Sequence, residues 1–91
     1  METLVAYTNL SETKTPQVCP VVGLDGHMLQ VKLPVYASIG SAVKIETDDT
    51  MSLGEVSYCQ PEQDGYVVWI HLLQALHDVT ELSRLARALV A

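Results

Sequence analysis

Alternating apolar and polar side chains predict β-strands in the second half of the chain. Between residues 42 and 47, Val43 and Ile45 alternate with Lys44 and Glu46, which is the period of a strand with one buried and one solvated face. Residues 53–59 follow the polar turn 47–50 and show the same period. We expect this second strand to divide its side chains between two faces, with Gly54, Val56 and Tyr58 on one and Glu55, Ser57 and Cys59 on the other.

A third strand is predicted at residues 66–72. It follows a loop that ends in Asp64-Gly65, a pair that favours a hairpin because glycine tolerates positive φ. Both faces of this strand carry apolar side chains, so we expect one face to be buried and the other to be partly covered. The two faces are Tyr66, Val68, Ile70 and Leu72 against Val67, Trp69 and His71.

The first half of the chain predicts two further strands and an N-terminal segment. Residues 17–22 form a candidate strand in which Pro20 lacks a backbone donor, so we expect this strand at an edge or at a bulge. Residues 23–26 are expected to turn the chain into a more regular strand at residues 28–33. The apolar run 4–7 is either an edge strand or a frayed arm, and residues 8–16 are expected to form a surface loop.

Five or six short antiparallel strands without helices between them indicate a small, partly open β-barrel. We expect a single domain, with residues 1–16 as an N-terminal arm, residues 17–72 as the barrel and residues 78–90 as a helix. The main core is predicted to consist of aliphatic side chains from the barrel strands: Leu29, Val31, Leu33, Val43, Ile45, Val56, Val68 and Ile70.

The last segment has the 3.6-residue period of an amphipathic helix. Asp78 is suited to be the N-cap, and Glu81 completes the spacing of a capping box. Because an isolated helix of about twelve residues is marginal in water, its apolar stripe is expected to pack on the barrel or on a partner subunit. The stripe consists of Val79, Leu82, Leu85, Ala86 and Leu89.

Composition argues against several classes of partner. Eleven acidic residues against five lysines and arginines give a net charge of −6, which repels phosphate backbones and anionic lipids. Neither nucleic acid nor a membrane is therefore expected as a partner. No apolar run approaches the roughly 18–20 residues of a membrane helix, and the first residues lack the basic start of a signal peptide, which favours a cytoplasmic location.

Residues that commonly carry catalysis or bind metals are few and scattered, so no enzymatic activity, metal or cofactor is expected. The three histidines have no spacing that forms a metal site on one element: His27, His71 and His77. No serine lies in a nucleophile elbow, and the neighbours His77 and Asp78 are better explained by the helix cap. Cys19 and Cys59 lie outside any Cys-x-x-Cys motif, so two reduced thiols are expected.

The order and spacing of these elements resemble the PilZ family, the bacterial receptor domains for cyclic di-GMP. The resemblance covers roughly residues 17–90 and rests on the segments 21–26, 28–33, 39–43, 54–56 and 66–72. It implies a PilZ-like barrel with a C-terminal helix and a role in bacterial signalling.

The chain departs from that family in the residues that hold the ligand. Members typically have an Arg-x-x-x-Arg motif in the N-terminal arm and an Asp-x-Ser-x-x-Gly motif at the first turn. Here no arginine precedes Arg84, and Val21 and Gly23 stand at the aspartate and serine positions, while Gly26 matches the final glycine. Trp69 stands where the family commonly has a small glycine, and it could fill space that a bound nucleotide would use.

Resemblance and motif loss together predict an interaction module that does not bind cyclic di-GMP and acts through a protein partner or its own oligomer. Losing two arginine–phosphate contacts, at roughly 1.5–3 kcal/mol each, weakens binding by about two to four orders of magnitude. The alternative is a cyclic di-GMP receptor, whose ligand residues would be Gly23, Asp25, Gly26 and Trp69. A small hydrolase using His71 or His77 is a remote third possibility without a supporting constellation.

Overall fold

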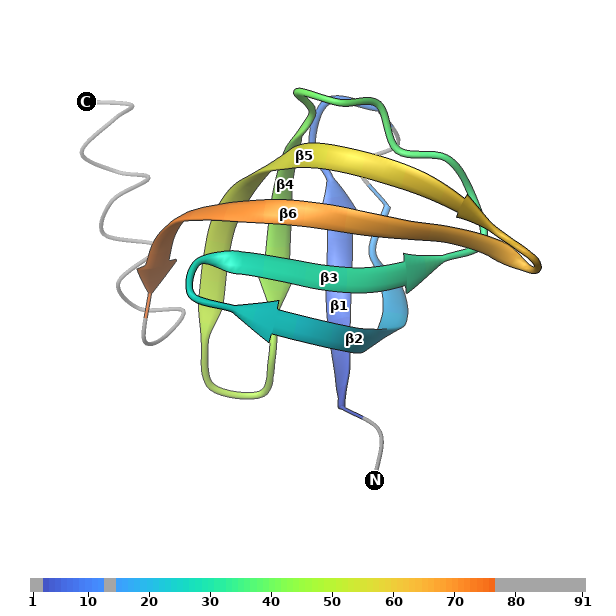
Figure 1. Cartoon of the computed structure of the whole chain (residues 1–91). Helices are drawn as coiled ribbons and strands as arrows, with labels where there is room; N and C mark the ends of the chain where they lie inside the picture. Colours follow the sequence, from blue (N-terminus) through green and yellow to red (C-terminus); the bar gives the residue numbers. More distant parts are fainter. Residues whose placement is uncertain (1–2, 13–14, 77–91) are drawn as a thin grey trace.

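The computed structural model describes residues 3–12 and 15–76, which form six β-strands closed into an antiparallel barrel (Figure 1). The strands are β1 (Leu4–Asn9), β2 (Gln17–Asp25), β3 (Met28–Leu33), β4 (Ala42–Glu46), β5 (Met51–Glu62) and β6 (Gly65–Leu76). Around the barrel their order is β1-β2-β3-β6-β5-β4, and β4 pairs back with β1. The segment 78–90, with the predicted stripe Val79, Leu82, Leu85, Ala86 and Leu89, lies outside the described residues.

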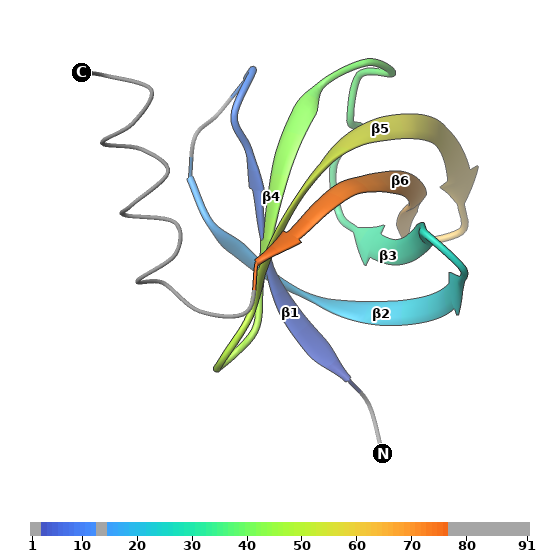
Figure 2. The ribbon, with the colours of Figure 1, turned by 90° about the vertical axis from the view of Figure 1, so that its left-hand side faces the viewer.

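Strand β1 closes the barrel. It pairs with β2 along Leu4–Tyr7 and with β4 along Ala6–Asn9, and Figure 2 shows β1 and β4 running side by side. The six-stranded alternative is therefore confirmed, with the run 4–7 inside a strand instead of a frayed arm. The predictions of a partly open barrel and of a surface loop starting at Thr8 are wrong, and residues 4–9 belong to the barrel instead of to a separate arm over residues 1–16. The hydrophobic pattern does not reveal the full length of this strand, because its last two residues are polar. Thr8 and Asn9 are nevertheless buried, each only 3% exposed.

The predicted core is confirmed. All eight of its aliphatic side chains are at most 6% exposed, and they come from β3, β4, β5 and β6 as the alternation required. The barrel adds further buried side chains that the alternation did not single out, which are Val5, Tyr7, Cys19, Ala37 and Cys59. Ala37 comes from the connection between β3 and β4, so this connection contributes to the interior as well.

Strand β5 reverses its two faces half-way along its length. Its pairing with β6 shifts register between Val56 and Tyr58, where one extra residue bulges out. As a result Cys59 is 8% exposed and faces the core, whereas Tyr58 is 51% exposed and faces outward. The predicted faces of residues 53–59 are thus wrong for Tyr58 and Cys59, because the extra residue Ser57 exchanges the inner and outer positions that follow it.

Strand β2 is longer than predicted and contains the other expected irregularity. Its pairing with β3 shifts register between Val21 and Gly23, so the bulge predicted from Pro20 occurs close to that residue. Gly23 and Asp25 belong to the strand, and the chain turns at Gly26 and His27 instead of over residues 23–26. Gly26 has a φ of +62°, a conformation that glycine adopts without the strain of a side chain.

Among the residues that the structure describes, no helix is long and apolar enough to cross a membrane.

Candidate functional site: an aromatic face on the outside of the barrel

Four residues form one row across the outer face of four neighbouring strands. Gly23 of β2 lies opposite Gln30 of β3, Gln30 lies opposite Trp69 of β6, and Trp69 lies opposite Tyr58 of β5. The residues on either side of Gln30 and of Trp69 are buried in the core, so the row itself faces outward. We call Gly23, Gln30, Trp69 and Tyr58 the outer row.

The aromatic pair at one end of the outer row is its largest feature. The ring centroids of Tyr58 and Trp69 lie 5.5 Å apart, and the ring planes are inclined at 59°. Trp69 is half-buried and Tyr58 is exposed, so the pair presents a broad apolar surface to solvent. Aromatic rings with one open side are typical of recognition surfaces, because they bury large areas with few rotatable bonds.

The other end of the outer row is filled by the side chain of Gln30. A Cβ atom on Gly23 would lie 3.1 Å from Cδ of Gln30, so the amide of Gln30 covers the place where a side chain at residue 23 would stand. The outer row thus brings together two of the residues predicted for a nucleotide site, Gly23 and Trp69, with Gln30 between them. Asp25 lies two residues further along β2, and Gly26 lies in the following turn with no atom within 4 Å of its Cβ position.

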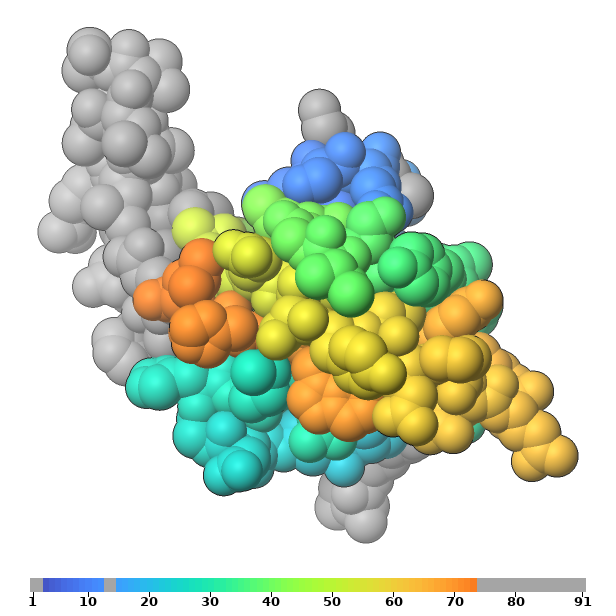
Figure 3. Space-filling model, turned by 45° about the horizontal axis from the view of Figure 1, so that its top comes forward, coloured from blue at the N-terminus to red at the C-terminus, as the bar shows by residue number. Residues whose placement is uncertain are grey.

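A shallow hollow adjoins the aromatic pair. Met28, His71 and Glu55 lie opposite one another in the row next to the outer row, and the exposed Ile39 of the β3–β4 connection adds a further apolar side chain. The face made by β5, β6 and this connection is continuous in the space-filling view (Figure 3). Residues that line the hollow are Met28, Ile39, Glu55, Val56, Ser57 and His71.

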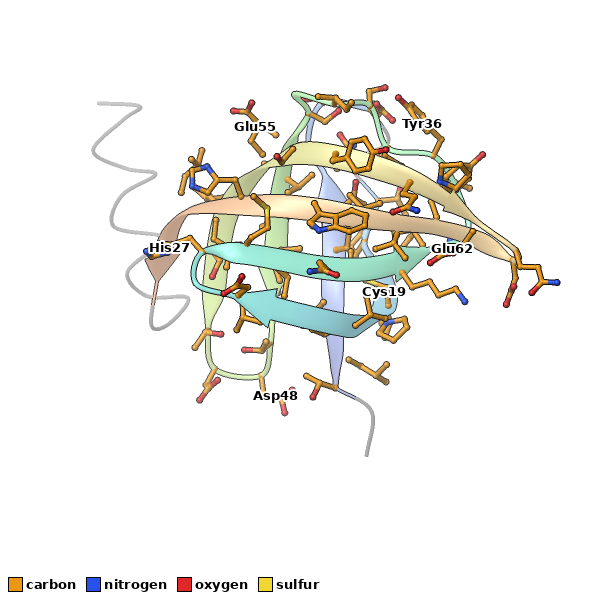
Figure 4. The ribbon with its side chains drawn as sticks, in the orientation of Figure 1. Cys19, His27, Tyr36, Asp48, Glu55 and Glu62 are labelled. Atoms are coloured by element: carbon orange, nitrogen blue, oxygen red, sulfur yellow. The ribbon has the colours of Figure 1, made fainter. Side chains whose placement is uncertain are left out.

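The hollow contains the residue types of a hydrolase without their arrangement. Ser57, His71 and Glu55 line it together, yet no hydrogen bond joins His71 to either of the other two. His71 is exposed to solvent, and no carboxylate of the described residues is hydrogen-bonded to it to orient its ring as a base. His77, the other predicted candidate, lies outside the described residues, and His27 lies in the exposed β2–β3 turn (Figure 4).

Each lysine that the structure describes lies next to a carboxylate. Among the residues described, the two lysines are both paired: Lys32 Nζ lies 3.4 Å from Asp64 Oδ2, and Lys44 Nζ lies 3.4 Å from Glu46 Oε1. The described part of the chain contains no arginine. A ligand with phosphate groups would therefore meet no cation beside the outer row that is not already next to a carboxylate.

A polar network at one mouth of the barrel fixes the β1–β2 loop. The side-chain oxygen of Asn9 accepts hydrogen bonds from the backbone N–H groups of Ser11 and Glu12, both at 3.0 Å, and its amide nitrogen donates to the Tyr7 hydroxyl at 3.2 Å. These bonds satisfy a side chain that is almost fully buried, which explains how a polar residue can end a barrel strand.

Glu12 connects this loop to the β3–β4 connection. Its carboxylate accepts hydrogen bonds from the backbone N–H of Ser38 and from the hydroxyl of Ser41, both at 3.2 Å. The bonds from Ser38, and then that from Ser41, hold the pKa of Glu12 below its usual value. Since Glu12 thereby ties the β1–β2 loop to the connection between β3 and β4, we interpret this network as structural.

Both cysteines are buried free thiols, as predicted. Cys19 of β2 and Cys59 of β5 face the core, and burial raises the pKa of Cys19 to about 11. A thiol in this state is a poor nucleophile at neutral pH. In the described ranges, no group of three or more His, Cys, Asp or Glu side chains could hold a metal ion.

Comparison of the chain with models of known protein families, with curated proteins and with solved structures gives no significant match. The outer row therefore carries the functional interpretation by itself. Sequence reasoning had placed Trp69 and Gln30 on outward faces but Tyr58 on the inner one, because a bulge leaves no mark in the alternation until the strand has been paired.

Proposed function

We propose that the protein is a PilZ-like interaction module that binds a protein partner, or a second copy of itself, and does not bind cyclic di-GMP. The observation that supports this proposal best is the aromatic pair of Tyr58 and Trp69, which is open to solvent and has no unpaired cation beside it among the described residues. Exposed aromatic side chains are enriched where proteins contact one another, whereas a dianionic nucleotide requires positive charge as well.

The chemistry of the outer row argues against the cyclic dinucleotide. Its two phosphates would need arginine or lysine partners, and the described residues offer only Lys32 and Lys44, each beside a carboxylate. Gln30 also covers the backbone at Gly23, and the two rings fill the other end of the row. Both ends of the row are thus occupied by the protein's own side chains.

One observation favours the alternative, a cyclic di-GMP receptor. A guanine base could stack on the exposed rings of Tyr58 and Trp69. Gly23, Asp25 and Gly26 lie on β2 and in the turn after it, two strands away from Trp69 on β6. Stacking contributes roughly 1–3 kcal/mol per base, which by itself corresponds to millimolar binding at best.

Calorimetric titration of the full chain with cyclic di-GMP separates the two functions. We expect no saturable heat, or a dissociation constant weaker than about 0.1 mM, because the arginine–phosphate contacts are missing. A micromolar dissociation constant would reverse the assignment in favour of the receptor.

Site-specific photocrosslinking tests the interaction itself. A photoreactive amino acid in place of Tyr58 is expected to form a discrete adduct in cells, with another protein or with a second copy of the chain. The same amino acid in place of Asp48, in the β4–β5 turn far from the outer row, serves as the matched control (Figure 4). Equal labelling from both positions, or none from residue 58, would contradict an interaction through the outer row.

A further inference from the structure

We infer that the outer row binds an arginine-bearing segment of a partner protein, with the guanidinium stacked on the Tyr58–Trp69 pair and neutralised by Glu55. This inference rests on the proposed function, and it names the chemistry of the partner. Three features of the described residues support it: the open aromatic rings, the neighbouring carboxylate of Glu55 and the hollow beside them.

The aromatic pair is suited to a planar cation. The faces of Trp and Tyr rings carry negative potential, and arginine stacks on them through its flat guanidinium more readily than lysine does through its compact ammonium. With its rings 5.5 Å apart and inclined at 59°, the pair presents two differently oriented surfaces to one ligand group. Aromatic side chains whose neighbouring lysine, Lys32, is already paired with Asp64 thus favour a ligand that brings its own positive charge.

One carboxylate, that of Glu55, is a near neighbour of the pair, and two more lie further away on β5 and on β2. Glu55 lies opposite His71, two residues along β6 from Trp69, so the two side chains are diagonal neighbours roughly 7–8 Å apart. Glu62 lies further along β5, and Asp25 lies at the end of β2. Lys32, the nearby cation, is already paired with Asp64. A guanidinium on the rings would therefore have Glu55 within reach and no unpaired lysine of the described chain to compete with it.

The same charge argues against the other occupants of this face. A second copy would bring its own acidic residues against these, and two chains of net charge −6 repel each other. Nucleic acid and anionic lipid are repelled for the same reason. A cationic partner is the one class for which the long-range field of the protein and the local contacts act in the same direction.

The hollow offers apolar surface for a second side chain of the partner segment, next to the one that carries the cation. Met28, which lies opposite His71 two residues along β6 from Trp69, lines the hollow together with Ile39, which is 60% exposed. An aliphatic side chain close to the arginine would bury this surface. The partner segment is therefore expected to combine arginine with leucine, isoleucine or valine.

Trp69 allows a direct test, because it is the only tryptophan of the chain. The full chain is titrated with a short peptide containing arginines and leucines while the emission of Trp69 is followed. Matched peptides replace every arginine by lysine, by the neutral isostere citrulline or by glutamate. We expect saturable binding that is tightest for arginine, about two- to fivefold weaker for lysine, weaker again for citrulline and undetectable for glutamate.

Two variants with the same net charge separate local contact from general attraction to an acidic protein. Glu55→Gln is expected to weaken binding of the arginine peptide by about two- to fivefold, whereas Asp48→Asn leaves it nearly unchanged. Equal weakening by both variants would overturn the site, since it would reduce the effect to net charge. Citrulline binding as tightly as arginine would overturn the cationic partner.

These outcomes are distinct from failure of the proposed function. If the citrulline peptide equals the arginine peptide while residue 58 still crosslinks a protein in cells, the interaction module stands and only its partner chemistry is wrong. If no peptide binds and cyclic di-GMP does, the proposed function itself fails. Crosslinking of residue 58 to a second copy of the chain would replace the cationic partner by an oligomer.

Discussion

Tyr58 contacts Trp69 on the outside of the barrel because one extra residue in β5 turns Tyr58 outward. The ring centroids lie 5.5 Å apart, and the register shift lies between Val56 and Tyr58, directly before the aromatic residue. If Ser57 were paired as a regular strand residue, Tyr58 would point into a core already filled by Val56, Val68 and Ile70. A local irregularity of one strand thus creates the surface on which the proposed function depends.

Deleting Ser57 tests this relationship. The deletion removes the residue of β5 that has no partner on β6, so Tyr58 follows Val56 directly and regular alternation keeps Tyr58 outward and Cys59 inward. We expect the deletion to lower the free energy of unfolding by no more than about 1–2 kcal/mol, because the strand keeps both faces and loses only its local bend. Ser57→Ala keeps the bulge and is expected to change stability by less than about 0.5 kcal/mol. A loss of about 3 kcal/mol or more on deletion, measured by urea denaturation, would show that Ser57 is not the extra residue that sets the two faces.

A second register shift, between Leu53 and Gly54, brings β5 unusually close to β6. A Cβ on Gly54 would lie 2.7 Å from the carbonyl oxygen of His71 and 2.9 Å from Cγ2 of Ile70. We expect Gly54→Ala to destabilise the protein by about 1–3 kcal/mol, because the backbone of a paired strand cannot move away without breaking its ladder.

Gly23→Ala is the matched control for this substitution. There the new methyl group meets only the end of the Gln30 side chain, at 3.1 Å, and that side chain can rotate away. The expected cost is below about 1 kcal/mol, and both variants are compared by thermal unfolding. A larger loss at residue 23 than at residue 54 would contradict the close approach of β5 and β6.

The barrel core could be predicted from sequence because its positions obey a simple rule. Leu29, Val31 and Leu33 alternate with polar residues, and so do Val43 and Ile45, which leaves one arrangement that buries the aliphatic side chains. Closure by β1 could not be predicted in the same way. That strand ends in a buried threonine and a buried asparagine, and the hydrogen bonds that satisfy the asparagine come from a loop whose position only the folded chain defines.

The candidate site was partly predictable for a related reason. Trp69 and Gln30 follow the regular alternation of β6 and β3, so their outward orientation follows from sequence alone. Tyr58 lies after a bulge, and Gly23 lies after another, so the alignment of all four residues in one row depends on two register shifts. Short-range sequence patterns do not encode such register shifts, because a register shift depends on which strand pairs with the one that carries it.

Replacing Ile45 tests the interior directly. Ile45 is 5% exposed on β4, and Ile45→Ala removes three buried carbon atoms from the barrel. We expect a loss of about 2–4 kcal/mol in chemical denaturation. Ile39→Ala makes the same change at a side chain that is 60% exposed, and its effect is expected to stay within about 0.5 kcal/mol. An unchanged unfolding midpoint for Ile45→Ala would show that the side chain of Ile45 does not face the core.

The buried thiol of Cys19 predicts how stability depends on alkaline pH. Burial raises its pKa from 9.0 to about 11, so the unfolded chain releases this proton at a lower pH than the folded chain does. The contribution of the neutral thiol is therefore fully present below pH 9 and is lost as the pH rises towards 11. Urea denaturation at a series of pH values should show stability falling across this window.

Cys19→Ala separates this thiol from other groups that titrate in the same range. Burial also raises the pKa of Tyr7, which adds a fall of the same sign at higher pH in both proteins. The variant is expected to be less stable at neutral pH, because it leaves a small cavity, but to lose less stability between pH 9 and 11 than the wild type does. Identical pH slopes for the two proteins would mean that Cys19 is accessible to solvent in the folded barrel, contrary to its 2% exposure.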